Sequence, residues 1–269
     1  MTGPQRLAQA AGRLKTKVGA AFPGERAVFR GHDLHTGLKD MGWIDLCAFG
    51  ITGRRLSAAQ LKLVESMWVW TSYPDARIWN NRVAALAGST RSTPALALSA
   101  GQAVSEAMIY GRRNEFRALA FFKRTHQAML AGASLGDCID QHLAQQGKLA
   151  GYGRPLASGD ERIGPTMALA RELGLADGPH VTLAFEVDRL LQARGRPLRM
   201  NFGALVSAFG ADFGFSPRDC NLFYFPIFLA GMQPCYVEAA DQPPGTLFPT
   251  ACADVAYEGR GKRAWVTGA

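Results

Sequence analysis

The hydrophobic positions of this chain recur mostly at the spacing of a helix. After Ser57, the apolar side chains fall on one wide stripe formed by Leu61, Val64, Met67, Trp68 and Val69. Ser57 and Gln60 match the pattern of a capping box, so we expect a helix to begin there. Asn-Gly and Asp-Gly turns between alternating runs are missing. The pattern therefore predicts an all-α protein with few or no strands.

Further helix boundaries are marked by caps, prolines and glycines. Three more helix starts are predicted at Thr93-Pro94, Ser134 and Ser216-Pro217. Gly147 is expected to end the helix that begins at Ser134. The stretch 181–191 alternates at first, but its leucines and valines fit a helix better than a strand, so a helix is predicted.

A long stretch of small residues runs from Val83 to Ile109 and carries only Arg91 and Glu106 as charges. A helix that is apolar nearly all round belongs inside a domain or an interface. Polar, aromatic-rich segments flank it at 71–82 and 110–115, and we expect them to reach a partly buried site. Together with the apolar segment 223–232, this stretch predicts a twofold homodimer.

The net charge of +8 is concentrated at the two ends of the chain. No acidic residue precedes Glu25, and the body of the chain is nearly neutral, so nucleic-acid binding has little support. Residues 1–29 are predicted to form a flexible basic arm. No signal segment is visible and the apolar runs are too short to span a membrane, which predicts a cytoplasmic protein without membrane contact.

Neither cysteine nor histidine spacing indicates a metal site. The five cysteines form no Cys-x-x-Cys pair, and the five histidines show no metal-binding spacing. His126 and His142 are expected to be solvated on their helices. No metal is therefore expected.

Several short motifs follow one another along the chain. They are Arg30-Gly31-His32-Asp33-Leu34, Leu86-Ala87-Gly88-Ser89, Gly151-Tyr152-Gly153 with Asp160-Glu161-Arg162, Asn201, and Ala256-Tyr257-Glu258-Gly259. In this order they resemble segments of the citrate synthase superfamily, particularly short members such as stand-alone citryl-CoA lyases. Each motif is short, and the resemblance covers residues 30 to about 265.

The resemblance implies an all-helical fold with a large domain, residues 30–110 and 204–269, and a small inserted domain, residues 111–203. The small domain would close over a coenzyme A (CoA) thioester within a homodimer. Members of the superfamily make or break a carbon–carbon bond beside the thioester carbonyl, using two histidines and an aspartate.

The resemblance fails at the residues that carry this chemistry. The first histidine of the family falls on Tyr110, the second on Arg154 and the aspartate on Gly203. Of the carboxylate-binding arginines, only Arg162 keeps its type. Without the aspartate the standard reaction lacks its base, and glycine cannot supply one. We therefore expect no citrate formation from acetyl-CoA and oxaloacetate.

The replacing residues are polar, which favours a rebuilt site over a decayed one. Tyr110 is predicted as an oxyanion-type donor, Asp75 as the first candidate base, and Arg154 as a catalytic cation that grips an anion together with Arg162. Glu106 and Glu115 are rivals of Asp75 that the sequence does not separate. Further predicted substrate-binding residues are Arg77, Asn80, Arg82, Asn114 and Asn201. The alternative for these residues is a polar dimer interface or a buried hydrogen-bond network.

The glycine-containing loop is expected to contact the CoA thioester. Its predicted contact residues are Ala150, Gly151, Tyr152 and Gly153, and Lys148 could offset phosphate charge. The sequence thus predicts an enzyme of carbon–carbon bond formation or cleavage that acts on a carboxylate-bearing CoA thioester. A non-catalytic relative that binds a ligand or a catalytic partner is the alternative, and RNA binding through the basic termini is a third possibility.

Overall fold

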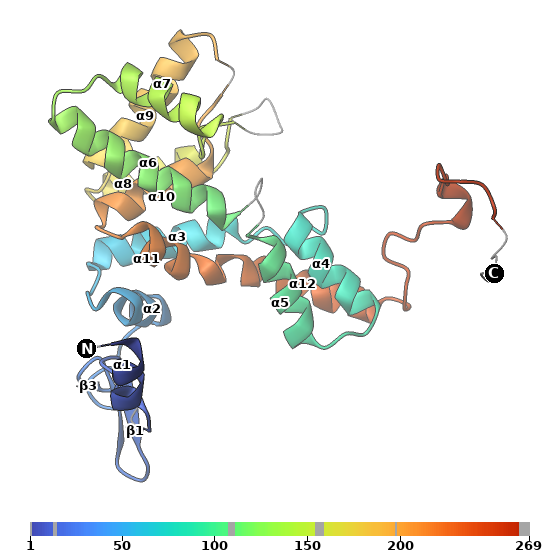
Figure 1. Ribbon diagram of the computed structural model, residues 1–269, viewed down its shortest axis with the longest axis horizontal. Helices are drawn as coiled ribbons and strands as arrows, with labels where there is room; N and C mark the ends of the chain where they lie inside the picture. The colour runs from blue at the N-terminus through green and yellow to red at the C-terminus, as the bar shows by residue number, and fades with distance from the viewer. Residues whose placement is uncertain (1, 13–14, 107–110, 154–158, 197, 264–269) are drawn as a thin grey trace. The chain divides into compact units, whose positions relative to one another are not determined.

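The computed structural model describes residues 2–12, 15–106, 111–153, 159–196 and 198–263, except for the side chain of Arg112. Helices dominate the chain (Figure 1). The helices are α1 Gly3–Ala10, α2 Trp43–Thr52, α3 Ala58–Thr71, α4 Trp79–Ser89, α5 Pro94–Val104, α6 Arg112–Leu130, α7 Leu135–Gln146, α8 Ile163–Glu172, α9 Pro179–Ala193, α10 Phe202–Asp212, α11 Pro217–Phe223, η1 Phe225–Phe228, α12 Leu229–Asp241 and η2 Cys252–Asp254. This content confirms the predicted all-α class.

The chain divides into two compact units. The first unit contains Met1–Ser72 and Ser105–Phe228, and the second contains Tyr73–Val104 and Leu229–Ala269. The predicted small domain, residues 111–203, lies wholly within the first unit. Its boundaries with a large domain at 30–110 and 204–269 stay a prediction.

The core of the first unit gathers around α6 and α10, which pack on each other and on α9 (Figure 1). Its largest buried side chains are aromatic and no more than 2% exposed: Tyr224, Phe121, Phe122, Phe209, Phe215 and Phe223. Burying such a ring contributes roughly 1.5–3 kcal/mol. This core fixes the helices that carry the candidate site.

The predicted helix starts are confirmed by their side-chain caps. The Gln60 amide donates to Ser57 Oγ at 3.2 Å, and the Ser57 amide donates back to Gln60 Oε1 at 2.9 Å. Ser134 and Ser216 accept comparable bonds from the residues three positions later. The stretch 181–191, predicted as a helix, lies in α9.

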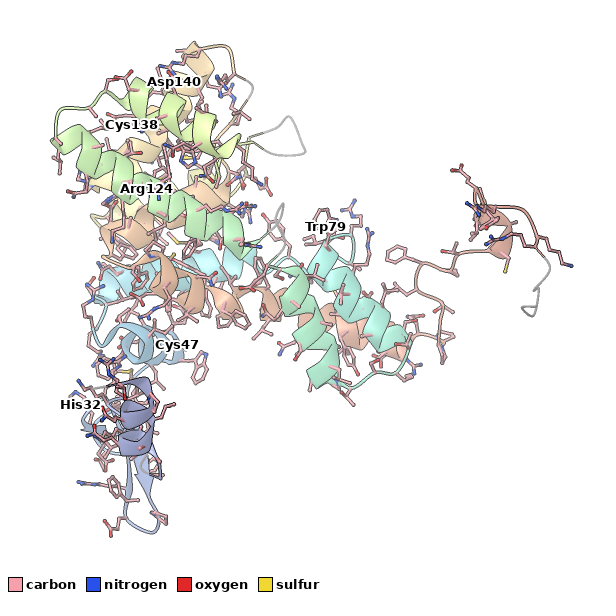
Figure 2. All side chains as sticks on the ribbon, in the orientation of Figure 1. His32, Cys47, Trp79, Arg124, Cys138 and Asp140 are labelled. Atoms are coloured by element: carbon pink, nitrogen blue, oxygen red, sulfur yellow. The ribbon has the colours of Figure 1, made fainter. Side chains whose placement is uncertain are left out.

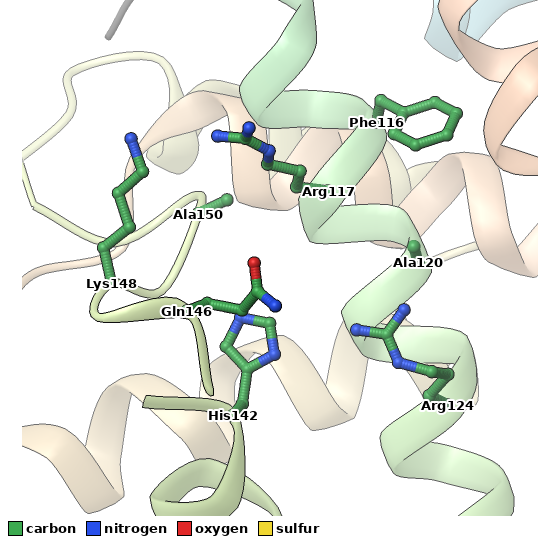
Figure 3. Close-up of a pocket in the computed structure, with 8 residues that line it drawn as sticks. All are labelled: Phe116, Arg117, Ala120, Arg124, His142, Gln146, Lys148 and Ala150. Atoms are coloured by element: carbon green, nitrogen blue, oxygen red, sulfur yellow. The ribbon is translucent and has the colours of Figure 1, made fainter. Parts of the chain in front are cut away.

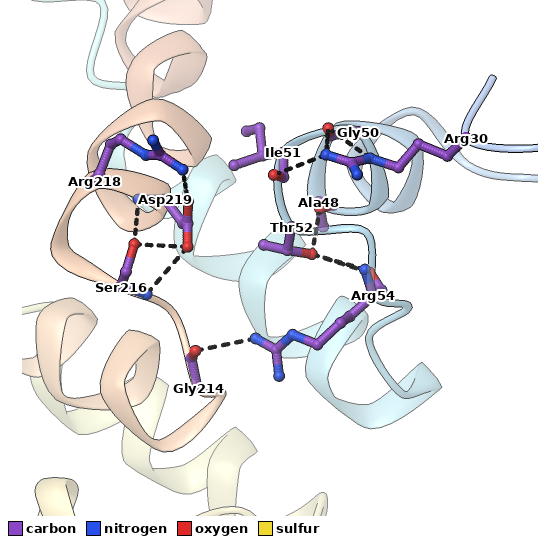
Figure 4. A network of polar contacts seen from close by, with 10 residues as sticks. All are labelled: Arg30, Ala48, Gly50, Ile51, Thr52, Arg54, Gly214, Ser216, Arg218 and Asp219. Carbon is purple, nitrogen blue, oxygen red and sulfur yellow. Dashed lines mark hydrogen bonds and ion pairs between the residues drawn. The ribbon is translucent and has the colours of Figure 1, made fainter. Parts of the chain in front are cut away.

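Two arginines satisfy the carbonyl groups at helix ends in the first unit (Figure 4). Arg30 Nη2 donates to the carbonyls of Gly50 at 2.8 Å and Ile51 at 3.2 Å, near the end of α2. Arg54 Nη2 donates to the carbonyl of Gly214 at 3.1 Å, after α10. The last carbonyls of a helix lack partners within it, so these contacts tie separate elements together.

A small antiparallel sheet lies between α1 and α2 in the chain. Strands β1 Gly19–Phe22 and β2 Arg26–Phe29 form a hairpin, and β3 His32–Asp33 pairs with β2. The described part of residues 1–29 thus contains α1, β1 and β2, and the predicted flexibility of this segment stays a prediction. The short strands agree with the expectation of few strands.

The second unit is formed by α4, α5, α12 and the C-terminal segment. The single helix expected from Val83 to Ile109 is wrong, because α4 ends at Ser89 and α5 begins at Pro94. Arg91 adopts a left-handed φ of 62° in the connection, and its Nη2 donates to the Gln242 carbonyl at 2.7 Å. The Thr93-Pro94 helix start is confirmed.

Within the second unit, Gly88 lets α4 approach α12 closely, and Gly231 lets α12 approach the segment before α4. A Cβ atom at Gly88 would lie 2.4 Å from the Tyr236 carbonyl oxygen, and one at Gly231 would lie 2.7 Å from that of Tyr73. No larger residue fits at either position without moving backbone. The absence of charge in this stretch therefore reflects close helix packing.

The five cysteines, all among the described residues, are free, and Cys220 and Cys235 are buried. Figure 2 labels the half-buried Cys47 and Cys138 on α2 and α7. In the described ranges, no helix is long and apolar enough to cross a bilayer. The same ranges contain no group of three or more His, Cys, Asp or Glu side chains suited to a metal ion.

Candidate active site

The loop Ala150–Gly153 is attached to the segment that leads into α10. The Gly153 amide donates to the Arg199 carbonyl at 2.7 Å, and the Asn201 amide donates to the Gly151 carbonyl at 2.9 Å. Asn201 Nδ2 reaches the Gly153 carbonyl at 3.1 Å, while its Oδ1 caps α10 by accepting from the Ala204 amide. Asn201, predicted to bind substrate, therefore holds the loop against the helix start.

Gly151 and Tyr152 have different structural roles in this loop: Gly151 allows a close backbone approach, and Tyr152 is buried. Gly151 has a φ of 89°, and a Cβ atom there would lie 2.7 Å from the Cβ of Ala204. Tyr152 is 6% exposed, its hydroxyl donates to the Ala184 carbonyl at 2.8 Å, and burial raises its pKa. The Tyr152 side chain thus packs inside the protein and stabilises the loop. Backbone and small side chains form the outer edge of the loop.

A basic pocket of about 320 Å³ lies between α6, α7 and this loop (Figure 3). Its described lining residues are Phe116, Arg117, Ala120, Arg124, His142, Gln146, Lys148 and Ala150. Three of them are cations, and none of these described residues is acidic. The pocket is therefore suited to an anion.

His142 is half-buried at this pocket, which corrects the expectation that it is solvated. Its ring lies edge-on to Phe121 with centroids 4.9 Å apart. Burial and the positive charge of Arg124 lower the pKa of His142. His126 is also half-buried, with its ring centroid 4.8 Å from that of His180.

Arg162 engages its neighbour Asp160 with a fork of hydrogen bonds. Its Nε donates to Asp160 Oδ1 at 2.8 Å, and its Nη2 donates to Oδ2 at 2.9 Å. The guanidinium also lies over the Phe202 ring, 4.5 Å from its centroid, and the Phe202 amide donates to Asp160 Oδ2. Arg162 therefore forms a structural contact with Asp160. Its binding of a substrate carboxylate stays a prediction.

The start of α6 lies against the start of α10. Ser207 is fully buried and its hydroxyl lies 2.6 Å from the Gly203 carbonyl oxygen and 3.1 Å from that of Glu115. A Cβ atom at Gly203 would lie 3.5 Å from Cγ and 3.9 Å from Oε1 of Glu115. The half-buried carboxylate of Glu115 thus stands beside the backbone of Gly203.

Four predicted site residues lie in the second unit. Arg77 Nη2 and Asp75 Oδ2 form an ion pair at 2.7 Å, and hydrogen bonds from Arg77 lower the pKa of Asp75 to about 2. Arg82 is exposed and lies over the Phe248 ring, 5.4 Å from its centroid. Asn80 is 1% exposed at the start of α4.

Two predicted catalytic residues, Tyr110 and Arg154, lie outside the described residues. Asn114 is half-buried in the first turn of α6, where its backbone amide donates to the Gly111 carbonyl at 3.1 Å. Within the described first unit, Asn114 lies in α6, Asn201 caps α10 and holds the loop, and Arg162 lies over the Phe202 ring of α10. Roles in catalysis or binding for all these residues stay predictions.

Sequence reasoning missed the pocket residues on α6. Arg117, Ala120 and Arg124 recur at intervals of three and four, so they share one helix face, opposite the buried Phe122. That spacing was a readable signal. This face meets His142 and Lys148 only through tertiary packing, so no local sequence pattern could predict that these residues line one pocket.

No protein-family model matches the sequence, and comparison with curated proteins finds no match. Among solved structures, the chain is similar to citryl-CoA lyase from Hydrogenobacter thermophilus, with a TM-score of 0.82 and 20% identity over 94% of this chain and 97% of that chain. It is also similar to ATP citrate lyase from Methanosaeta concilii in complex with (3S)-citryl-CoA, with a TM-score of 0.69 and 17% identity over 97% of this chain and 45% of that one.

A third similar structure is citrate synthase from Thermoplasma acidophilum in a ternary complex with carboxymethyl coenzyme A and oxaloacetate. Its TM-score is 0.65, with 16% identity over 84% of this chain and 59% of that chain. At these identities the likeness shows the fold alone. The chain has the all-helical fold shared by citryl-CoA lyase and citrate synthase, as its motifs predicted.

Proposed function

We propose that this protein is a citrate-synthase-like enzyme that acts on a carboxylate-bearing CoA thioester and makes or breaks a carbon–carbon bond. The observation that carries the proposal is the likeness to citryl-CoA lyase, which spans 94% of this chain and 97% of the other. The match covers nearly the whole of both chains, and the order of the sequence motifs agrees with it.

The basic pocket supports CoA as part of the substrate. Arg124 and Lys148 bring positive charge to a cavity whose wall includes Ala150, the first residue of the loop predicted to contact CoA. The phosphate groups of CoA are anions that guanidinium and ammonium groups bind with charge-assisted hydrogen bonds. Protonation of His142 would add a further charge next to Arg124.

The reaction is not that of citrate synthase. Gly203 offers no carboxylate at the position of the family's aspartate, and Tyr110 and Arg154 replace the two histidines. We expect a thiol-release assay with acetyl-CoA and oxaloacetate to show no citrate formation. The polar replacements serve a rebuilt site whose substrate differs from that pair.

A non-catalytic relative is the second candidate, and Gly203 is the observation that favours it. Such a protein would bind CoA or a catalytic partner without turning over a thioester. Binding and turnover therefore have to be measured separately.

The assembly proposed for this enzyme is a twofold homodimer. Apolar side chains on α4, α5 and α12 of the second unit are exposed: Leu86 on α4 by 40%, Leu96 on α5 by 67% and Val237 on α12 by 55%. Burying such groups against a second copy of the chain would stabilise the dimer through the hydrophobic effect.

Calorimetric titration with CoA tests the proposal, followed by a screen of CoA thioesters for cleavage that includes (3S)-citryl-CoA. We expect saturable binding that Arg124→Gln weakens, because the pocket loses one of its cations. Arg171→Gln is the matched control, since Arg171 is an exposed arginine of α8 that does not line the pocket. Binding without turnover of any thioester would favour the non-catalytic alternative, and the absence of binding would defeat the proposed enzyme and leave only a relative that pairs with a catalytic partner.

A further inference from the structure

His142 and Arg124 face each other across the basic pocket, one from α7 and the other from α6 (Figure 3). Arg124 is exposed, and its guanidinium forms no hydrogen bond or ion pair with any described residue. Burial and the charge of Arg124 lower the pKa of the half-buried His142. Two groups that repel each other as cations therefore stand on opposite walls, and an anion between them would attract both.

One ring nitrogen of His142 already has a partner. A hydrogen bond with the backbone of Lys148, at the start of the loop, raises the pKa of His142 against the other two effects. A bond that favours the charged ring is one in which the ring donates, so the acceptor is the Lys148 carbonyl. In the neutral ring the second nitrogen is then an acceptor, whereas in the imidazolium both nitrogens donate. His142 can therefore bind an anion in the pocket only after it takes up a proton.

The charged groups around this ring are cations or have partners elsewhere. α6 contributes Arg117 and Arg124 to the pocket, the loop contributes Lys148, and no described lining residue comes from α9, which also packs against α7. On α7 itself, Asp140 pairs with the arginine that follows α9 at 2.8 Å, and Asp137 accepts from the serine hydroxyl at the start of the helix. The anion that suits this place therefore comes from a ligand.

The phosphomonoester of CoA suits the pocket better than its diphosphate bridge. A volume of about 320 Å³ is near the lower limit for small-molecule sites, roughly 300–1,000 Å³, so the pocket holds one part of CoA. A phosphomonoester carries about −1.5 to −2 charges at pH 7, because its second pKa is about 6, whereas each phosphate of the bridge carries a single charge. Attraction to Arg124 and to a proton on His142 grows with this charge.

We infer that His142 is the residue that makes this pocket specific for the phosphomonoester of CoA. The inference rests on the proposed function. As an imidazolium, His142 donates one N–H to the Lys148 carbonyl and the other to the phosphate, which Arg124 binds from the opposite wall. The proton comes from the solvent, and no bond between heavier atoms forms or breaks. Because hydrogen bonds from a charged donor are stronger, the bound phosphate also strengthens the contact between α7 and the start of the loop.

The test is calorimetric titration of the full chain at pH 7 with CoA and with dephospho-CoA, which lacks the phosphomonoester. Each titration is repeated in two buffers of different ionisation enthalpy, because the difference in heat gives the number of protons taken up on binding. We expect CoA to bind about 10- to 100-fold more tightly, the usual contribution of one charge-assisted hydrogen bond, and to bind with net proton uptake. Dephospho-CoA should bind without proton uptake, because it leaves the space between His142 and Arg124 empty.

Two matched histidine variants complete the test. His142→Gln keeps an N–H donor but cannot take up a proton, so it should lose the proton uptake and most of the preference for CoA. Its affinity for dephospho-CoA should be unchanged, which shows at the same time that the variant is folded. His126→Gln is the control, because His126 is a half-buried histidine of α6 that does not line the pocket, and it should keep both properties.

The outcomes that overturn the inference differ from the one that defeats the proposed function. Equal affinity for the two ligands, or a preference for CoA without proton uptake, would overturn the inference and leave the function standing. A His142→Gln protein that keeps the preference would do the same. Equal loss of affinity for both ligands in this variant would also overturn it, by making His142 a structural support of the loop. An unaltered protein that binds no CoA would defeat the proposed enzyme itself.

Discussion

Replacing Arg162 by lysine separates a structural role of this arginine from a role in binding. The side chain is 20% exposed, and the Asp160 carboxylate that it contacts is completely buried. Lysine keeps the charge but cannot form the two parallel bonds that Arg162 makes to Asp160 at 2.8 and 2.9 Å. It also changes the contact with the Phe202 ring.

The expected loss follows from these contacts. One charge-assisted hydrogen bond contributes roughly 1.5–3 kcal/mol, and the contact of a cation with an aromatic ring adds about 0.5–1 kcal/mol. Arg162→Lys should therefore lower the free energy of unfolding by about 2–4 kcal/mol, measured by urea denaturation with circular dichroism. Arg171→Lys is the control, because Arg171 is an exposed arginine at the other end of α8 and should change little.

A double-mutant cycle with Asp160→Asn assigns the effect to the pair. If the fork contacts carry the loss, the second substitution should have a much smaller effect once Arg162 is lysine. An unchanged free energy of unfolding in Arg162→Lys, together with weakened substrate binding, would refute this reasoning. It would then show that the arginine serves the ligand, as the sequence suggested.

Three further predictions concern the loop, the pocket and the assembly. Gly151→Ala should lower both the melting temperature and the affinity for CoA. Alanine is strained at the φ of 89°, and its Cβ would lie 2.7 Å from the Cβ of Ala204. Unchanged CoA binding in calorimetry would count against a contact between this loop and CoA. Burial and the Arg124 charge lower the pKa of His142 in the free protein, and a bound CoA phosphate should raise it again. Binding of CoA should therefore be accompanied by proton uptake at His142, and the affinity should increase as the pH falls below 6.5. Calorimetry across this range should show a shallower dependence in His142→Gln, and identical pH profiles would contradict the assignment. Light scattering should give twice the chain mass of 29.0 kDa, whereas a monomer at micromolar concentration would contradict the proposed dimer.

Local patterns in the sequence predicted local structure well. The cap at Ser57 could be predicted because both of its bonds join residues three positions apart. The break between α4 and α5 contradicted the single helix that the uncharged stretch predicted, although Thr93-Pro94 had marked a helix start there. Low charge in that stretch came from close packing at Gly88, which a sequence pattern does not distinguish from one continuous buried helix.

The candidate site was less predictable because its parts meet only through tertiary packing. The loop residues were found from a motif, but the role of Tyr152 as scaffold depends on its bond to the distant Ala184 carbonyl. Glu115 could not be separated from its rivals in the sequence. Glu115 lies beside Gly203 only because Ser207 and its neighbours let two helices come close.

A crystal structure of the protein with CoA tests the central claim most directly. The account predicts phosphate groups within hydrogen-bonding distance of Arg124 and Lys148. CoA bound away from this pocket would contradict it.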